Sequence, residues 1–248
     1  MNPIKNWKRF VAIGCTHGHL IDRVARDAIL RFCRHFRPHT RIHLGDAFDL
    51  TCFRTGALRG DVDSGRPVEG DMADGTRFMS DYQPTLFFCG NHEARLWKLC
   101  DHPSAIVAGL AGRLRQDLEE VCAEARCKII PYAGVYSFLK IGNYKFGHGY
   151  LFNENACRDH AEAHGNVIFA HTHRAGIARA RRDDDAQGIC TGTLAEIQCL
   201  EYSHTKRSTL SWSQGFVFGE YSDSLMVPVL FQQPKGCLLY TSPSPRDS

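Results

Sequence analysis

Histidine, aspartate, asparagine and cysteine recur in five short clusters, each directly after an apolar run. The clusters are Cys15-Thr16-His17, Gly45-Asp46 with Asp49, Gly90-Asn91-His92-Glu93, Gly147-His148 and His171-Thr172-His173. Imidazole, carboxylate, amide and thiol groups together suit borderline metals such as Zn, Mn or Fe. Polar residues that follow a buried strand are placed where ligands bind in α/β sheets. The order and placement of the five clusters therefore predict a metal site.

The chemistry that this set favours is phosphoester hydrolysis with two metal ions. The negative charge of a phosphoester repels hydroxide, and two cations about 3.5–4 Å apart neutralise that charge and lower the pKa of a bound water. A carboxylate bridges two ions well, and Asp46 is the candidate. The departing alkoxide needs a proton, which a histidine of near-neutral pKa can supply. His92, beside Asn91, is the candidate proton donor.

As a series, the clusters resemble the motifs of the calcineurin-like metallophosphoesterase superfamily. Its pattern is Asp-x-His, Gly-Asp-x-x-Asp, Gly-Asn-His-Glu/Asp, Gly-His and Gly-His-x-His, and the match runs from about Arg9 to Phe231. The resemblance implies an α/β fold, a four-layer α/β/β/α sandwich of two mixed β-sheets flanked by helices, with the site at strand ends. The stretch from Trp212 to Phe216 is similar to versions in phage and mobile-element genomes.

The resemblance also implies a role for each matching residue. One divalent metal ion would be held by Cys15, His17, Asp46 and His173, and a second by Asp46, Asn91, His148 and His171. His92 would protonate the leaving oxygen, and Asp49 would orient His92. Asn91 and Arg95 would contact the substrate phosphate, although Arg95 is equally compatible with a solvated position on a helix.

Cys15 stands where the superfamily has its first aspartate. A thiolate binds zinc or iron well and manganese or magnesium poorly. In one interpretation Cys15 is a ligand, and among Zn, Fe, Mn and Ni the site prefers a softer metal. In a second, Cys15 does not bind and His19 or Asp22 partly substitutes. In a third, the protein is a poor enzyme that binds phosphorylated ligands.

The predicted function is that of a metallophosphoesterase, a phosphatase or phosphodiesterase acting on a small molecule, a nucleotide or nucleic acid. Leu50 and Cys89 occupy the places of two arginines that bind phosphate in the protein phosphatases of the superfamily. This disfavours a phosphoprotein substrate, and no obligate protein partner is expected. The alternative is a non-catalytic or weakly active metal-dependent binding module for nucleic acid or a phosphorylated partner.

The elements that must position these clusters follow from hydrophobic periodicity. Strands are expected at Arg9–Gly14, Arg41–Leu44, Thr85–Cys89, Lys128–Tyr132, Val135–Ile141, Tyr144–Phe146, Val167–Ala170, Gly176–Ala180, Gly188–Thr191, Leu210–Phe218 and Met226–Phe231. Helices are expected at Leu20–Phe36, Glu93–Leu99, Ser104–Arg126 and Glu154–His164. Gly142-Asn143 is a hairpin turn signal. Residues 55–82, rich in Gly, Asp and Arg, are predicted to form a long loop or lid.

Composition limits the wider organisation of the chain. The 248 residues are 43% hydrophobic with a net charge of +3. This composition allows a packed core and gives no argument by itself for nucleic acid or an anionic membrane. No apolar run approaches the ~20 residues of a membrane span. The eleven cysteines have irregular spacing and no secretory signal precedes them, so a reducing cytoplasm is expected.

We predict a single domain over residues 1–236. The following residues from Cys237 to Asp247, CLLYTSPSPRD, resemble the translation of a transposase sequencing adaptor. Residues 237–248 are therefore expected to be disordered and to contribute nothing to the fold.

Overall fold

The computed structural model describes residues 6–53, 68–199 and 211–233. The strands are β1 (Lys8–Ile13), β2 (Thr40–His43), β3 (Leu86–Phe88), β4 (Lys128–Ile130), β5 (Leu139–Ile141), β6 (Tyr144–Phe146), β7 (Val167–Phe169), β8 (Gly176–Arg179), β9 (Gln187–Cys190), β10 (Gly215–Tyr221) and β11 (Met226–Gln232). The α-helices are α1 (Arg23–Phe36), α2 (Val68–Tyr82), α3 (Glu93–Leu99), α4 (Ala105–Glu124) and α5 (Ala156–His164). The predicted adaptor-derived segment 237–248, and residues 55–67 of the predicted lid, lie outside the described residues.

The described strands form two mixed β-sheets. One has the strand order β11-β10-β1-β2-β3-β4, and the other has the order β5-β6-β7-β9-β8. In the first sheet β1 to β4 run parallel to one another, whereas β10 pairs antiparallel with both β1 and β11. In the second, β6, β7 and β9 run parallel between antiparallel edges. Parallel neighbours end on the same side of a sheet, so the loops after them meet there.

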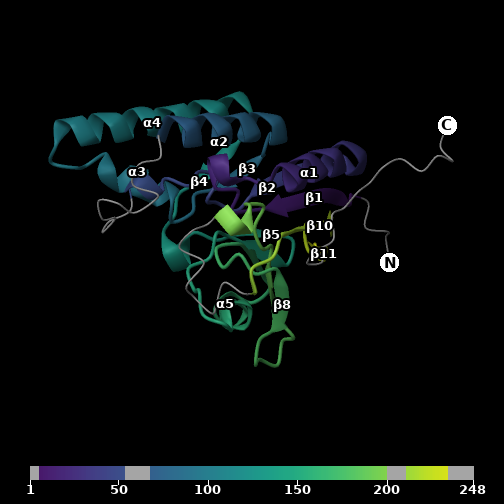
Figure 1. Ribbon diagram of the computed structural model, residues 1–248. Helices are drawn as coiled ribbons and strands as arrows, with labels where there is room; N and C mark the ends of the chain where they lie inside the picture. Colours follow the sequence, from purple (N-terminus) through teal and green to yellow (C-terminus); the bar gives the residue numbers. More distant parts are fainter. Residues whose placement is uncertain (1–5, 54–67, 200–210, 234–248) are drawn as a thin grey trace, which may run out of the picture.

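Helices cover the outer faces of the two sheets (Figure 1). Phe10 and Phe88 of the first sheet pack against Phe146 and Ile168 of the second, so the main core lies between the sheets. The helices α1, α2 and α4 lie on one side of the molecule and α5 on the opposite side. Ala156 of α5 packs against the outer face of the second sheet. This arrangement confirms the predicted four-layer α/β/β/α sandwich.

Local chemistry fixes the ends of the first helix. The Asp22 carboxylate accepts a hydrogen bond from the Ala25 backbone N–H at 2.9 Å, which caps the start of α1. Arg37 follows the last turn with a left-handed φ of 50°, and Pro38 cannot continue the helix. The helix begins later than the predicted Leu20–Phe36 because Gly18–Leu20 form a separate 3₁₀ turn.

A second difference concerns the strand expected at Val135–Ile141. Gly134–Tyr136 form a 3₁₀ turn, and only Leu139–Ile141 pair as β5. The Gly142-Asn143 hairpin is confirmed, because Ile141 pairs with Tyr144 and Gly142 has a φ of 59°. Such a φ favours glycine.

The predicted loop 55–82 is wrong for residues 68–82, which form α2. This helix buries Met72, Phe78 and Tyr82. Gly75 allows it close to Phe48, because a Cβ at Gly75 would lie 2.4 Å from the Phe48 ring. The apolar residues recur at helical spacing, but intervening glycines and aspartates of low helix propensity obscure the pattern. Among the described residues, no helix is both long and apolar enough to cross a membrane.

Candidate metal centre

The five polar clusters meet in one place, between the carboxyl ends of strands from both sheets. The loops after β1 and β2 are joined by backbone hydrogen bonds from the Cys15 N–H to the Gly45 carbonyl (2.9 Å) and from the His17 N–H to the Asp46 carbonyl (3.0 Å). The loop after β6 is joined to this pair through the ring of His148, described below. The sandwich therefore collects residues that lie far apart in the sequence.

A first set of potential ligands comprises Cys15, His17, Asp46 and His173, whose donor atoms all lie within 4.8 Å of one another. The Nε2 atoms of His17 and His173 are 3.0 Å apart. Two ligands about 2.1 Å from one metal ion at roughly tetrahedral to square angles are separated by about 3.0–3.4 Å. All four residues are buried. The set is therefore suited to one enclosed metal ion.

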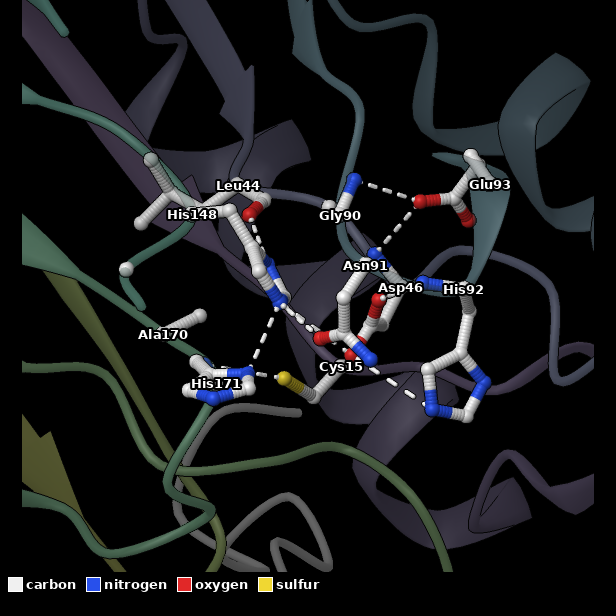
Figure 2. A network of polar contacts seen from close by, with 12 residues as sticks. Cys15, Leu44, Asp46, Gly90, Asn91, His92, Glu93, His148, Ala170 and His171 are labelled. Carbon is white, nitrogen blue, oxygen red and sulfur yellow. Dashed lines mark hydrogen bonds and ion pairs between the residues drawn. The ribbon is translucent and has the colours of Figure 1, made fainter. Parts of the chain in front are cut away.

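A second set comprises Asp46, His148 and His171, again with donor atoms within 4.8 Å. His148 Nε2 lies 3.2 Å from Asp46 Oδ2, 3.2 Å from His171 Nδ1 and 3.0 Å from Asn91 Oδ1. Figure 2 shows these groups pointing toward one another, with the Cys15 sulfur beside His171. Asp46 belongs to both sets, so its carboxylate is placed to bridge two ions.

The protein already fixes two imidazoles in the form that a metal needs. His148 Nδ1 donates a hydrogen bond to the Leu44 carbonyl at 2.7 Å, and His17 Nδ1 donates to Asp49 Oδ1 at 3.0 Å. A ring that donates through Nδ1 has the lone pair of Nε2 available, and such partners orient metal-binding histidines. In both residues Nε2 is the atom that faces the other potential ligands.

Backbone conformation marks the same residues. Five potential ligands have positive φ values, namely Cys15 (53°), His17 (52°), Asp46 (51°), His171 (66°) and His173 (57°). A left-handed backbone is uncommon for residues other than glycine, and strain of this kind concentrates at functional sites. The tight turns direct successive side chains into one small volume at a cost in conformational energy.

Cys15 lies inside the first set and forms contacts there. Its sulfur accepts a hydrogen bond from the His171 N–H at 3.2 Å. Burial, followed by the charge of Asp46, raises the pKa of the Cys15 thiol well above its usual value, so the protein alone favours the neutral thiol. A bound cation would oppose both effects.

The residues considered as substitutes for Cys15 have other positions. Asp22 caps α1, and His19 Nδ1 lies 3.5 Å from Asp71 Oδ1. Neither is among the described residues grouped as potential ligands, whereas Cys15 is. The geometry therefore favours the interpretation in which Cys15 faces the metal.

His92 lies beside the two sets, with only 7% of its surface exposed. Its backbone N–H donates to Asp46 Oδ1 at 3.0 Å, and its Nδ1 donates to the Asp49 carbonyl oxygen. The expected orienting contact thus comes from the backbone of Asp49, because the Asp49 carboxylate is bound to His17. Burial lowers the pKa of His92 to about 4. Its Nε2 lies 3.9 Å from Asp46 Oδ2, facing the centre.

Arg95 supports the same loop. Its Nη1 donates to the Leu50 carbonyl at 3.2 Å and lies 3.4 Å from the Asp49 carbonyl. The predicted contact of Arg95 with substrate stays a prediction, because its described contacts are to the loop after β2 and, at 3.4 Å, to His92 Nδ1.

Glu93 has a role that the sequence did not reveal. Its side chain is fully buried and accepts hydrogen bonds from three backbone N–H groups: Asp46 (2.9 Å), Phe48 (3.1 Å) and Gly90 (2.6 Å). Burial, followed by the charge of Asp46, raises the pKa of Glu93 to about 7. Glu93 therefore joins the loops that carry Asp46 and Asn91 (Figure 2). Its place directly after the Gly-Asn-His motif was the available signal.

Asp71 is the second residue that sequence reasoning missed. It lies on α2, is buried, and accepts hydrogen bonds from the N–H groups of Asp49 (3.0 Å) and Leu50 (2.8 Å). Gly18 packs so closely on it that a Cβ there would lie 1.8 Å from Asp71 Oδ1. The helix replacing the predicted loop thus supports the loops after β1 and β2.

Comparison with solved structures places this arrangement in a known fold. The chain is similar to a metallophosphoesterase from Sphaerobacter thermophilus, with 15% identity over 92% of this chain and 89% of that chain, at a TM-score of 0.50. Other similar structures are an archaeal phosphodiesterase (13% identity, 90% and 99% covered, TM-score 0.44) and the phosphoesterase YfcE from E. coli (13%, 89% and 98%, TM-score 0.41). No protein-family model and no curated protein sequence matches the chain. The chain has the metallophosphoesterase fold, which confirms the fold that the motif series implied.

Proposed function

We propose that this protein is a metal-dependent hydrolase of phosphomonoesters or phosphodiesters that works with two divalent metal ions. The observation that carries the proposal is the pair of adjacent donor sets that share Asp46. A single structural metal would need only one closed set of about four ligands. A shared carboxylate between two sets is the arrangement that two-metal hydrolysis requires.

Each ion would have its own ligands. Cys15, His17, Asp46 and His173 would hold one, and Asp46, Asn91, His148 and His171 would hold the other. Bound there, the ions would neutralise the phosphoester's charge and activate a water molecule as the nucleophile. Because Cys15 contributes sulfur, we expect zinc or iron to be preferred over manganese in the first position.

The other side chains would act on the substrate. His92 would act as the general acid in its imidazolium form. Its Nδ1 proton would stay on the hydrogen bond to the Asp49 carbonyl, and its second proton, on Nε2, would pass to the leaving oxygen. The Asp49 carboxylate would keep the proton of His17 on Nδ1, which leaves Nε2 available to bind a metal ion. Asn91 would contact a substrate oxygen, and Arg95 would reach the phosphate only by leaving its loop carbonyls.

The proposal extends to the setting of the reaction. We expect a small-molecule, nucleotide or nucleic-acid phosphoester as the substrate, because Leu50 and Cys89 stand where a phosphate-binding arginine pair would be needed for phosphoproteins. We expect a cytoplasmic location and no obligate protein partner.

Hydrolysis of p-nitrophenyl phosphate and bis-p-nitrophenyl phosphate, with Zn, Fe, Mn or Ni added in turn, tests the proposal. The His92→Ala variant should lose at least about 100-fold in kcat, as expected for a general acid, and should keep its metal content. The exposed His102→Ala variant is the matched control and should be unchanged. Folded, metal-loaded protein with no turnover would refute the proposal and favour a metal-dependent binding module.

A further inference from the structure

A basic hollow lies at the opposite end of β1 from the metal centre. It has a volume of about 580 Å³ and is lined by Arg9, Arg34, His35 and Arg37. Arg9 comes from the start of β1, Arg34 and His35 from the last turn of α1, and Arg37 from the residue that ends the helix. Every lining side chain is therefore a cation or can become one.

These arginines have no acidic partner among the described residues. No described carboxylate lies within 4.0 Å of Arg9, Arg34 or Arg37, and Glu220, which pairs with Arg9 in the strand ladder, forms no ion pair with it. Six other arginines on the described surface are paired with acids: Arg26 with Asp81, Arg77 with Asp74, Arg115 with Glu119, Arg179 with Asp185, Arg181 with Glu162 and Arg182 with Asp184. Single exposed arginines such as Arg23 and Arg113 also have no ion pair among the described residues, so the hollow is distinguished by bringing three such arginines together. The hollow therefore concentrates positive charge that the protein leaves unneutralised.

Helix stabilisation explains only part of this cluster. A cation in the last turn of a helix contributes about 0.3–1 kcal/mol through the helix dipole, which accounts for Arg34 or His35. Arg9 belongs to a strand, and its guanidinium carbon lies 5.4 Å from the centre of the Phe36 ring. A contact of this kind holds the guanidinium in place beside the helix end. Convergence from two elements points to an anionic ligand.

The residue types indicate which anion fits. Arginine presents a planar fork of donors that matches phosphate oxygens, whereas a general attraction to anionic membranes is served equally by lysine. Trp7, two residues before Arg9 in the chain, exposes 37% of its surface. Basic grooves with neighbouring exposed aromatic rings bind single-stranded nucleic acid, with bases stacked on the rings.

We propose that this hollow binds backbone phosphates of a single-stranded nucleic acid, with Trp7 as a stacking surface for a base. The hollow is separated from Cys15 by about 20 Å of extended chain, so it is distinct from the metal centre. It needs no metal ion, and the inference goes beyond the proposed hydrolase activity and does not depend on it.

Binding of a fluorescein-labelled thymidine oligomer of about 20 nucleotides, followed by anisotropy with a chelator present, tests the inference. The variant Arg34→Ala/Arg37→Ala should bind about 25-fold more weakly at about 0.1 M salt. Each lost phosphate contact on a single strand changes the slope of log K against log salt by about 0.7, so two lost contacts amount to about 1.4 log units over the decade from about 1 M to about 0.1 M salt. The slope itself should fall by about 1.4. Both side chains are exposed, so folding and metal content should not change.

The variant Arg113→Ala/Lys140→Ala removes the same charge from exposed positions on α4 and β5 and should reduce the slope by far less. Tryptophan fluorescence should be quenched by the oligomer in the wild type and less so in Trp7→Phe. Absent oligomer binding at about 0.05 M salt, or equal losses in the two double variants, would overturn the inference. The inference would also be overturned if the Arg34→Ala/Arg37→Ala variant lost binding to phosphatidylserine vesicles while its oligomer binding stayed unchanged.

Discussion

Replacement of Glu93 gives the sharpest test of how the site is held together. The side chain is fully buried, and its carboxylate accepts three backbone N–H groups from two loops. The Glu93→Ala variant leaves all three donors without a partner. Each buried unsatisfied donor costs about 1–3 kcal/mol, so the free energy of unfolding should fall by at least about 3 kcal/mol. That is a large part of the 5–15 kcal/mol typical of a domain.

A graded pair of variants separates this mechanism from a general effect of substitution. Oε2 of Glu93 accepts from Asp46 and Gly90, whereas Oε1 accepts only from Phe48. The amide oxygen of Glu93→Gln can replace Oε2 and leave one donor unpaired, at a cost of about 1–3 kcal/mol. The control Glu119→Ala breaks an exposed ion pair with Arg115 and should cost about 0.5 kcal/mol or less.

Urea unfolding of the metal-free protein under reducing conditions measures all three variants. Metal-free protein is used because a bound ion would add its own binding free energy to the stability. A Glu93→Ala variant within about 1 kcal/mol of wild type, or a Glu93→Gln variant at least as unstable as Glu93→Ala, would refute the reasoning.

Two further predictions concern residues around the centre. Gly45 has a φ of 98°, and a Cβ there would lie 2.6 Å from Gly90 N and His148 Nδ1. The free energy of unfolding of Gly45→Ala should therefore fall by at least about 2 kcal/mol. The control Gly109→Ala lies in open space on α4, and its free energy of unfolding should stay the same or rise by up to about 1 kcal/mol. Burial lowers the pKa of His160 to about 4, below its value of about 6.5 in the unfolded chain. The stability that neutral His160 contributes to the folded protein is therefore fully present above about pH 6.5 and is lost as the pH falls toward about 4. Between about pH 7.5 and pH 5 wild type should therefore lose about 2 kcal/mol more than His160→Gln in urea unfolding, and equal losses would contradict the pKa shift.

Cys15 connects the sequence to the identity of the metal. The structure places its sulfur with His17 and His173, as the motif series implied. Thiolate softness should then select zinc or iron over manganese. The prediction that distinguishes a ligand from a bystander is the metal content of wild type and Cys15→Asp, where unchanged metal amount and identity would remove Cys15 from the ligand set.

Strand ends were the most predictable part of the protein. Each apolar run ends where glycine and metal-competent residues begin, and these boundaries depend on side chains that are neighbours in sequence. The expected elements from β1 to β9 were recovered apart from small shifts at their ends and the shortened strand at Val135–Ile141. The strand predicted at Leu210–Phe218 is found at Gly215–Tyr221 instead, and β11 lies as expected. The strand–helix–strand pattern predicted parallel neighbours, whereas the four-layer fold class was implied by the resemblance of the motif series.

The helix α2 shows where local reasoning failed. Val68, Met72, Phe78 and Tyr82 recur at helical spacing, but glycines and aspartates between them have low helix propensity. Packing of Gly75 against Phe48 and burial of the apolar face stabilise the helix instead. Tertiary contacts of this kind cannot be read from a window of residues.

By itself the sequence determined which residues could bind metal and their placement after strands, and it predicted the class of chemistry that we propose. Only the tertiary structure shows which of the potential ligands lie together, because His17 and His173 are 156 positions apart and meet at 3.0 Å. It also assigned Asp49 to His17, and Glu93 and Asp71 to the backbone of the site loops. The physical reason is that ligand type is a property of a side chain, whereas hydrogen-bond partners depend on the loops that the two sheets bring together.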